Sequence, residues 1–146
     1  MAIDFDLSKL DDYLTSEDLE KDGIWMENFT GGIDIKIRRA GGANRKYTHA
    51  LLAAVKPYKK RRTGLDDLDP DISDKLLRRV YARTIVVGWR GVTGKDGKEI
   101  ECTPEAVEEL FKLVPELMRD VMELASSPRT FNEHQIEEAM EALGED

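Results

Sequence analysis

The chain has 146 residues, 40% of them hydrophobic, which is enough to bury the core of one ordinary domain. Its single cysteine, Cys102, excludes an internal disulfide, and no apolar run is long enough to predict a signal peptide or a membrane helix. The net charge of -8 disfavours a general polyanion-binding protein, and the expected compartment is a reducing cytoplasm.

The acidic total conceals alternating blocks of charge. Residues 1–23 carry a net charge of -6 and residues 34–62 a net charge of +9, whereas residues 75–98 carry +6 and residues 99–146 carry -11. Opposite charges in such blocks can pair within the fold or between copies of the chain. The basic middle therefore does not by itself predict nucleic-acid binding.

The first two segments differ in the period of their apolar residues. Residues 1–23 form an acidic N-terminal segment, where leucines at helical spacing predict a short helix. Residues 24–39 instead predict a β-hairpin, with one short strand at 24–27 and a second strand of alternating isoleucines. The residues that carry these patterns are Leu7, Leu10 and Leu14 for the helix, and Ile33, Ile35 and Ile37 for the second strand, which follows Gly31-Gly32.

Residues 44–143 predict a helical body. Its first helix begins after Asn44 and is expected to end near Pro57. The next helix follows Asp69-Pro70, an N-cap and first-turn pair, and its apolar face predicts a helix that continues to Gly88. We expect all of residues 1–146 to form one mainly α-helical domain of the α+β class with a small N-terminal hairpin.

The glycine-rich stretch after this helix, "GWRGVTGKDGKE", is similar to a phosphate-binding loop only at first sight. Five residues instead of four separate Gly88 from Gly94, and Asp96 stands where Ser or Thr would follow the lysine. Asp96-Gly97 is typical of a tight turn. No nucleotide is therefore expected here.

Three helices are predicted in the remaining chain. Thr103-Pro104 begins the first helix, and Pro115 separates it from the second. A capping box formed by Asn132 and Gln135 predicts that the last helix begins there, after "SSPRTFN" has interrupted the preceding one.

No pattern predicts catalysis, a metal site or a cofactor. The two histidines, His49 and His134, fall on separate predicted helices, and neither spacing brings them to Cys102. The acids Asp67, Asp69 and Asp71 have the spacing of a calcium loop, but later positions of that motif fail, so we interpret them as a capping linker. The chain is not expected to be an enzyme.

The chain from Tyr81 to Phe131 resembles the tail assembly chaperones of long-tailed bacteriophages. In that family a helix ending in Trp precedes a glycine turn, "DGKEI", a Thr-Pro or Ser-Pro helix start, an "LF" pair and "PEL". The upstream stretch "GIWMENFTGGIDIKIRRAGGANRKY" also resembles the family's opening, so the similarity covers about residues 24–131. The matching positions are Trp89, Gly91, Val92, Gly97, Lys98, Thr103, Leu110, Pro115, Leu117, Ala125 and Phe131.

The resemblance implies a non-enzymatic assembly factor of the host cell cytoplasm. Such a protein would bind the tape-measure protein, keep it soluble, recruit tail-tube subunits and be absent from the mature virion. Copies of the chain are also expected to contact one another, whereas a membrane or a nucleic acid is not an expected partner. The candidate partner-binding residues are Lys36, Arg38, Lys59, Lys60 and Arg61, with Met118 and Met122 as adaptable apolar contacts.

The alternative is a small nucleic-acid-binding accessory protein. Its basic loop, residues 56–62, would hold the phosphate backbone, and bases could stack on Tyr58 and Tyr47. The lysines and arginines of this loop are Lys56, Lys59, Lys60, Arg61 and Arg62.

Overall fold

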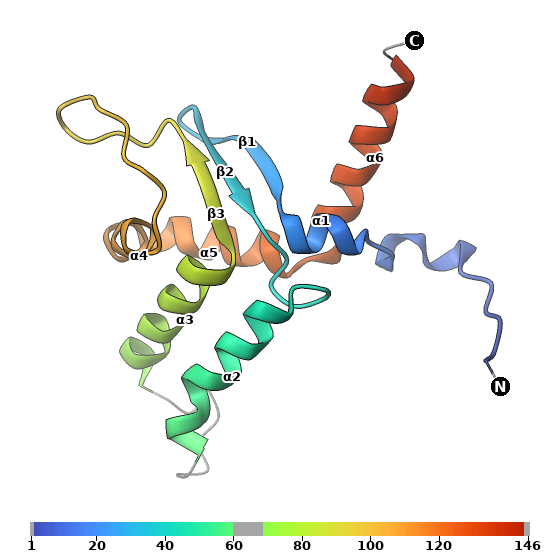
Figure 1. Cartoon of the computed structure of the whole chain (residues 1–146), viewed down its shortest axis with the longest axis horizontal. Coiled ribbons are helices and arrows are strands. Elements are labelled where there is room, and N and C mark those ends of the chain that lie inside the picture. The colour runs from blue at the N-terminus through green and yellow to red at the C-terminus, as the bar shows by residue number, and fades with distance from the viewer. Residues whose placement is uncertain (1, 60–68, 145–146) are drawn as a thin grey trace.

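The computed structural model describes residues 2–59 and 69–144, except for the side chains of residue 59 and of residues 133–136, 138 and 139. The fold is α+β, as predicted: 58% is helical, and a three-stranded antiparallel sheet lies near the N-terminus. Figure 1 shows the elements in chain order. They are η1 (Ser8–Tyr13), α1 (Glu17–Asp22), β1 (Ile24–Thr30), β2 (Ile33–Ile37), α2 (Arg45–Lys59), α3 (Pro70–Thr84), β3 (Val86–Arg90), α4 (Pro104–Leu113), α5 (Pro115–Ser126) and α6 (Pro128–Gly144).

The predicted hairpin is confirmed as β1 and β2. Ile24 pairs with Ile37 and Met26 with Ile35, and the register shifts between Met26 and Thr30. Asn28 takes a positive φ of 47° at this irregularity, and its side chain accepts a hydrogen bond from the Gly32 N–H at 3.0 Å. Asparagine tolerates this left-handed backbone because its short side chain bonds locally.

The prediction that the third helix continues to Gly88 is wrong. Helix α3 ends at Thr84, and Val86–Arg90 forms β3, which pairs antiparallel with β2. Valines and tryptophan suit a pleated sheet, and pairing with β2 outweighs the helical spacing of the upstream apolar residues. Gly88 fits this position because a Cβ there would lie 3.3 Å from the Trp25 ring.

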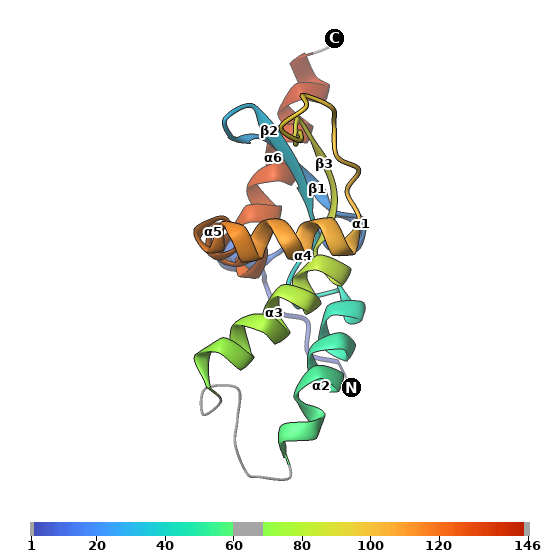
Figure 2. The same cartoon turned by 90° about the vertical axis from the view of Figure 1, so that its left-hand side faces the viewer.

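The core lies between the sheet and the helices packed on it. It contains Ile35 and Ile37 from β2, Tyr81 from α3, Phe111 from α4 and Val121 from α5, all nearly closed to solvent. Helices α2 and α3 run side by side away from the sheet in both views (Figures 1 and 2). The rings of Tyr47 and Tyr81 join them edge to face, with centroids 5.7 Å apart.

Two predicted helix boundaries are confirmed by their caps. The Asp69 side chain accepts from the Asp71 N–H at 2.8 Å, and the Thr103 hydroxyl accepts from the Ala106 N–H at 3.1 Å. Helix α5 begins at Pro115, as expected.

Two other boundaries differ from the prediction. Helix α2 passes through Pro57 to Lys59, because a proline in the last turn removes only one hydrogen bond near the helix end. Helix α6 begins at Pro128 instead of after Asn132, since proline is well suited to a first helical position. Of the acids interpreted as a capping linker, Asp69 lies within the described residues and Asp67 lies outside them.

Candidate partner-binding surface

Large apolar side chains are exposed at both ends of the described chain. In the N-terminal segment Phe5 is 69% exposed and Tyr13 74%, and near the end of α6 Leu143 is 77% exposed. Exposed apolar side chains elsewhere, such as Leu113, are scattered over other elements. We call the exposed set at the two ends the terminal apolar residues: Ile3, Phe5, Leu7, Leu10, Tyr13, Leu14, Met140 and Leu143.

Hydrogen bonds from a side chain of α6 to the backbone of the N-terminal segment hold the two together. The side-chain amide of Asn132 donates to the Asp11 carbonyl at 2.6 Å and to the Leu14 carbonyl at 2.5 Å. Because the backbone makes these contacts, the apolar side chains of the segment remain at the surface. Figure 1 shows that the N-terminal segment and the distal half of α6 lie on the same side of the molecule and diverge from this junction.

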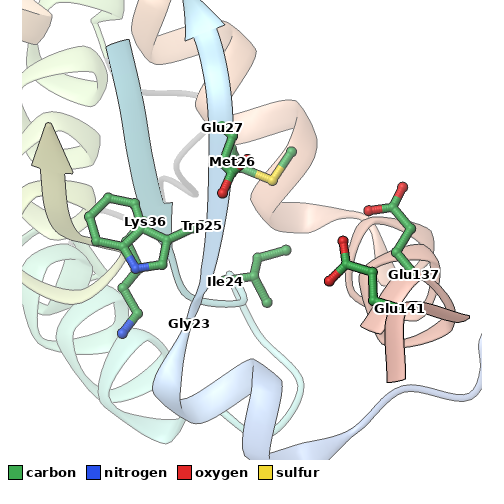
Figure 3. A pocket seen from close by; sticks show the side chains of 8 residues that line it. All are labelled: Gly23, Ile24, Trp25, Met26, Glu27, Lys36, Glu137 and Glu141. Carbon is green, nitrogen blue, oxygen red and sulfur yellow. The ribbon is translucent and has the colours of Figure 1, made fainter. Parts of the chain in front are cut away.

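A groove separates β1 from the distal half of α6. Its volume is about 530 Å³, and its lining residues are Gly23, Ile24, Trp25, Met26, Glu27, Lys36, Glu137 and Glu141. Figure 3 shows Ile24 and Met26 on the side of β1 that faces α6, where they oppose the two glutamates of the helix. The groove therefore has Ile24, Met26 and Glu27 on its β1 wall and two further carboxylates on its α6 wall.

The strand that lines this groove is at the edge of the sheet. In the described chain β1 pairs with β2 alone, so its outer edge faces the groove without a strand partner. The opposite face of β1 is closed by Trp25, whose ring lies 3.9 Å beneath the Arg90 guanidinium. An edge strand beside an apolar groove is a surface that a partner segment can cover.

The predicted partner-binding residues do not form one cluster. Lys36 lines the groove beside β1, whereas Arg38 lines a separate pocket at the start of α2. The side chain of Lys59 and all of Lys60 and Arg61 lie outside the described residues, as does Arg62 of the alternative.

The two methionines have different surroundings. Met118 is only 5% exposed and packs in the core, which corrects its prediction as a surface contact. Met122 is half-buried and packs against that core. Their helical spacing placed both on the apolar stripe of α5, and that stripe faces inward.

Of the residues considered for catalysis, the structure describes the side chains of His49 and Cys102. His49 is exposed on α2, and the side chain of His134 is outside the described part. Cys102 is half-buried, and burial raises the pKa of its thiol, so the reactive thiolate is disfavoured at neutral pH. Within residues 2–59 and 69–144 no three His, Cys, Asp or Glu side chains are grouped so that they could hold a metal ion.

The glycine loop after β3 is a structural connection. Gly97 takes a positive φ of 81° in the predicted tight turn, and the Lys98 N–H donates to Asp96 at 3.0 Å. The indole N–H of Trp89 donates to the Ile100 carbonyl at 2.7 Å, which fastens the far side of the loop to β3. The turn at Gly97 and these hydrogen bonds explain the conformation of the loop without a phosphate ligand.

Sequence reasoning recognised the leucines of the N-terminal segment as a helical face but did not identify them as a surface. Their exposure depends on which side of the segment docks on α6, and Asn132, interpreted as a cap, makes that contact. The sequence shows glutamates on the last helix, but nothing in it indicates that Glu137 and Glu141 lie across a groove from β1.

A known protein family matches most of the chain. The family model of the YdaY prophage protein matches residues 42–142, which is more than half of the chain. No curated protein and no solved structure matches the chain. Among the helices of the described residues, none has the length and apolar character needed to cross a membrane.

Proposed function

We propose that the chain, which belongs to the YdaY prophage protein family, is a phage tail assembly chaperone that covers apolar helical segments of a tape-measure protein. The observation that carries this proposal is the exposure of the terminal apolar residues. A monomer gains nothing by holding Phe5, Tyr13 and Leu143 in water, whereas a client with apolar faces can bury them.

The shape and charge of the groove support the same proposal. An amphipathic client helix would place an apolar residue against the half-buried Met26 and basic residues toward Glu137 and Glu141. Burial of the apolar side chains would supply affinity, and the acidic wall would select the orientation of the client. Several copies along one long client would add avidity and remain displaceable one at a time.

The resemblance of residues 24–131 to tail assembly chaperones supplies the identity of the proposed client. In this role the chain acts in the host cytoplasm without catalysis or a cofactor. It binds the tape-measure protein, contacts neighbouring copies and tail-tube subunits, and leaves before the virion is complete. The family membership establishes the phage origin, and the tail role is our proposal.

A capture experiment tests the proposal. The tagged chain is expressed together with the neighbouring tail genes, and the proteins that co-purify after nuclease treatment are identified by mass spectrometry. We expect one very long, helix-rich protein in stoichiometric amounts. In a parallel capture without nuclease, recovery of nucleic acid alone, released by high salt, would reject the chaperone and favour the basic 56–62 loop as a nucleic-acid site.

A further inference from the structure

A second pocket lies at the start of α2 and is rich in basic side chains. Its volume is about 350 Å³, and its lining residues are Lys21, Asp22, Arg38, Ala43, Asn44, Arg45 and Lys46. Four cations and one carboxylate therefore surround one cavity in a chain whose overall charge is -8.

Arg38 is the unusual member of this pocket. Its Nε atom is buried, and no described group accepts a hydrogen bond from it. The next residue provides a contrast, because the Arg39 Nε donates to Glu20 at 3.0 Å and its Nη1 donates to the Ala125 carbonyl at 3.2 Å. A buried donor without an acceptor is costly, and the residue that carries it also lines this pocket.

The other cations of the pocket form few ion pairs, and Asp22 is the one carboxylate that lines the pocket with them. Among the described residues neither Arg45 nor Lys46 forms an ion pair, and Lys21 only approaches Glu17 at 4.0 Å on the exposed side of α1. Glu20, the nearest buried acid, is occupied by Arg39. The first turn of α2 adds the positive end of a 15-residue helix to the same place.

We propose that this pocket is an oxyanion-binding site, in which Arg38, Arg45 and Lys46 hold a phosphate or carboxylate group. The guanidinium of Arg38 would donate from the closed end, and the two exposed cations would close over the anion from α2. The carboxylates of another copy are one source of such a group, because the N-terminal segment carries eight acids. A free phosphate ion is the other source.

Titration with inorganic phosphate tests the site directly. The full chain is titrated at constant ionic strength with chloride as the balancing anion, and backbone amide shifts are followed by NMR. We expect saturable shifts centred on residues 43–46, with affinity about tenfold weaker in Arg38→Gln and in Lys46→Gln. Lys75→Gln is the matched control, since it removes one exposed charge from α3 and should leave the affinity unchanged.

Sedimentation of the same variants distinguishes the two sources of the oxyanion. Self-association that phosphate reverses and Arg38→Gln abolishes would support the site and identify a second copy as its occupant. Saturable phosphate binding to a chain that stays monomeric would support a free oxyanion ligand. Unsaturable phosphate shifts together with self-association that ignores Arg38→Gln would overturn the proposal. Lys46→Gln keeps the test valid if Arg38→Gln does not fold, because Lys46 is exposed.

Discussion

At the scale of single residues, the buried ion pair of Glu20 and Arg39 connects α1 to the turn before α2. Their side chains are 7% and 13% exposed, and Glu20 also accepts from the Ala43 N–H at 3.3 Å. Gly42 is required beside them, because a Cβ there would lie 2.5 Å from a Glu20 oxygen. This pair fixes the turn that places Arg38 and Arg45 around the second pocket.

We predict that Glu20→Gln lowers the free energy of unfolding by about 3 kcal/mol, because it leaves the Arg39 cation buried without a counter-charge. Chemical denaturation measures this change. Glu17→Gln is the control: it breaks an exposed pair with Lys21 and should change stability by less than about 0.5 kcal/mol. Equal effects of the two substitutions would contradict this account of the turn.

Tyr81 gives a prediction about pH. Burial raises the pKa of its phenol well above the ordinary value of 10.0, and nearby Tyr47 adds to the effect. The unfolded chain therefore loses this proton first, and the stability due to Tyr81 is intact below about pH 10 and falls as the pH rises further. Between pH 10 and 11 the wild type should lose up to about 1.4 kcal/mol relative to Tyr81→Phe, as measured by denaturant unfolding. If the free energy of unfolding changes equally with pH in the two proteins, the phenol does not titrate as proposed.

At the scale of elements, the sequence predicted the strands and helix ends that depend on residues close together in the chain. The isoleucines of β2 determine one face of a strand, and the side chains of Asp69 and Thr103 cap their helices whatever packs around them. Strand β3 could not be predicted in this way, because Val86 and Val87 suit a helix face as well as a strand, and their partner lies about 50 residues earlier. The start of α6 was missed because Asn132 serves a tertiary contact. The exposed surface depends entirely on such contacts.

The loop between β3 and α4 provides a prediction at this scale. Trp89→Phe removes the donor to the Ile100 carbonyl, so we expect a loss of about 1 kcal/mol in stability and faster amide exchange over residues 91–100. Hydrogen–deuterium exchange followed by mass spectrometry measures the second effect. Trp25→Phe, which removes an indole that bonds to no loop carbonyl, should leave exchange in this loop unchanged. Equal protection of the amides of residues 91–100 in the two variants would mean that packing alone orders the loop.

At the scale of the whole molecule, the terminal apolar residues are separate from the core. The sheet and helices α3, α4 and α5, with Phe131 from the start of α6, enclose the core. The terminal apolar residues belong instead to the N-terminal segment and the distal half of α6, which extend from one side of the fold (Figure 1). Substitutions at the terminal apolar residues should therefore change client binding and leave the free energy of unfolding nearly unchanged. The two properties can be measured independently for that reason.

The most direct test is the solubility of the tape-measure protein when it is expressed with this chain. We predict that the wild type keeps the tape-measure protein in the soluble fraction and that the Phe5→Ser, Leu10→Ser double variant lets most of it aggregate, although the variant itself unfolds at the same denaturant concentration. Leu113→Ser is the control, because it removes from α4 an apolar side chain that is 71% exposed, close to the 69% of Phe5, away from both termini. A tape-measure protein that stays equally soluble with the wild type, the double variant and no added chain would contradict the chaperone function.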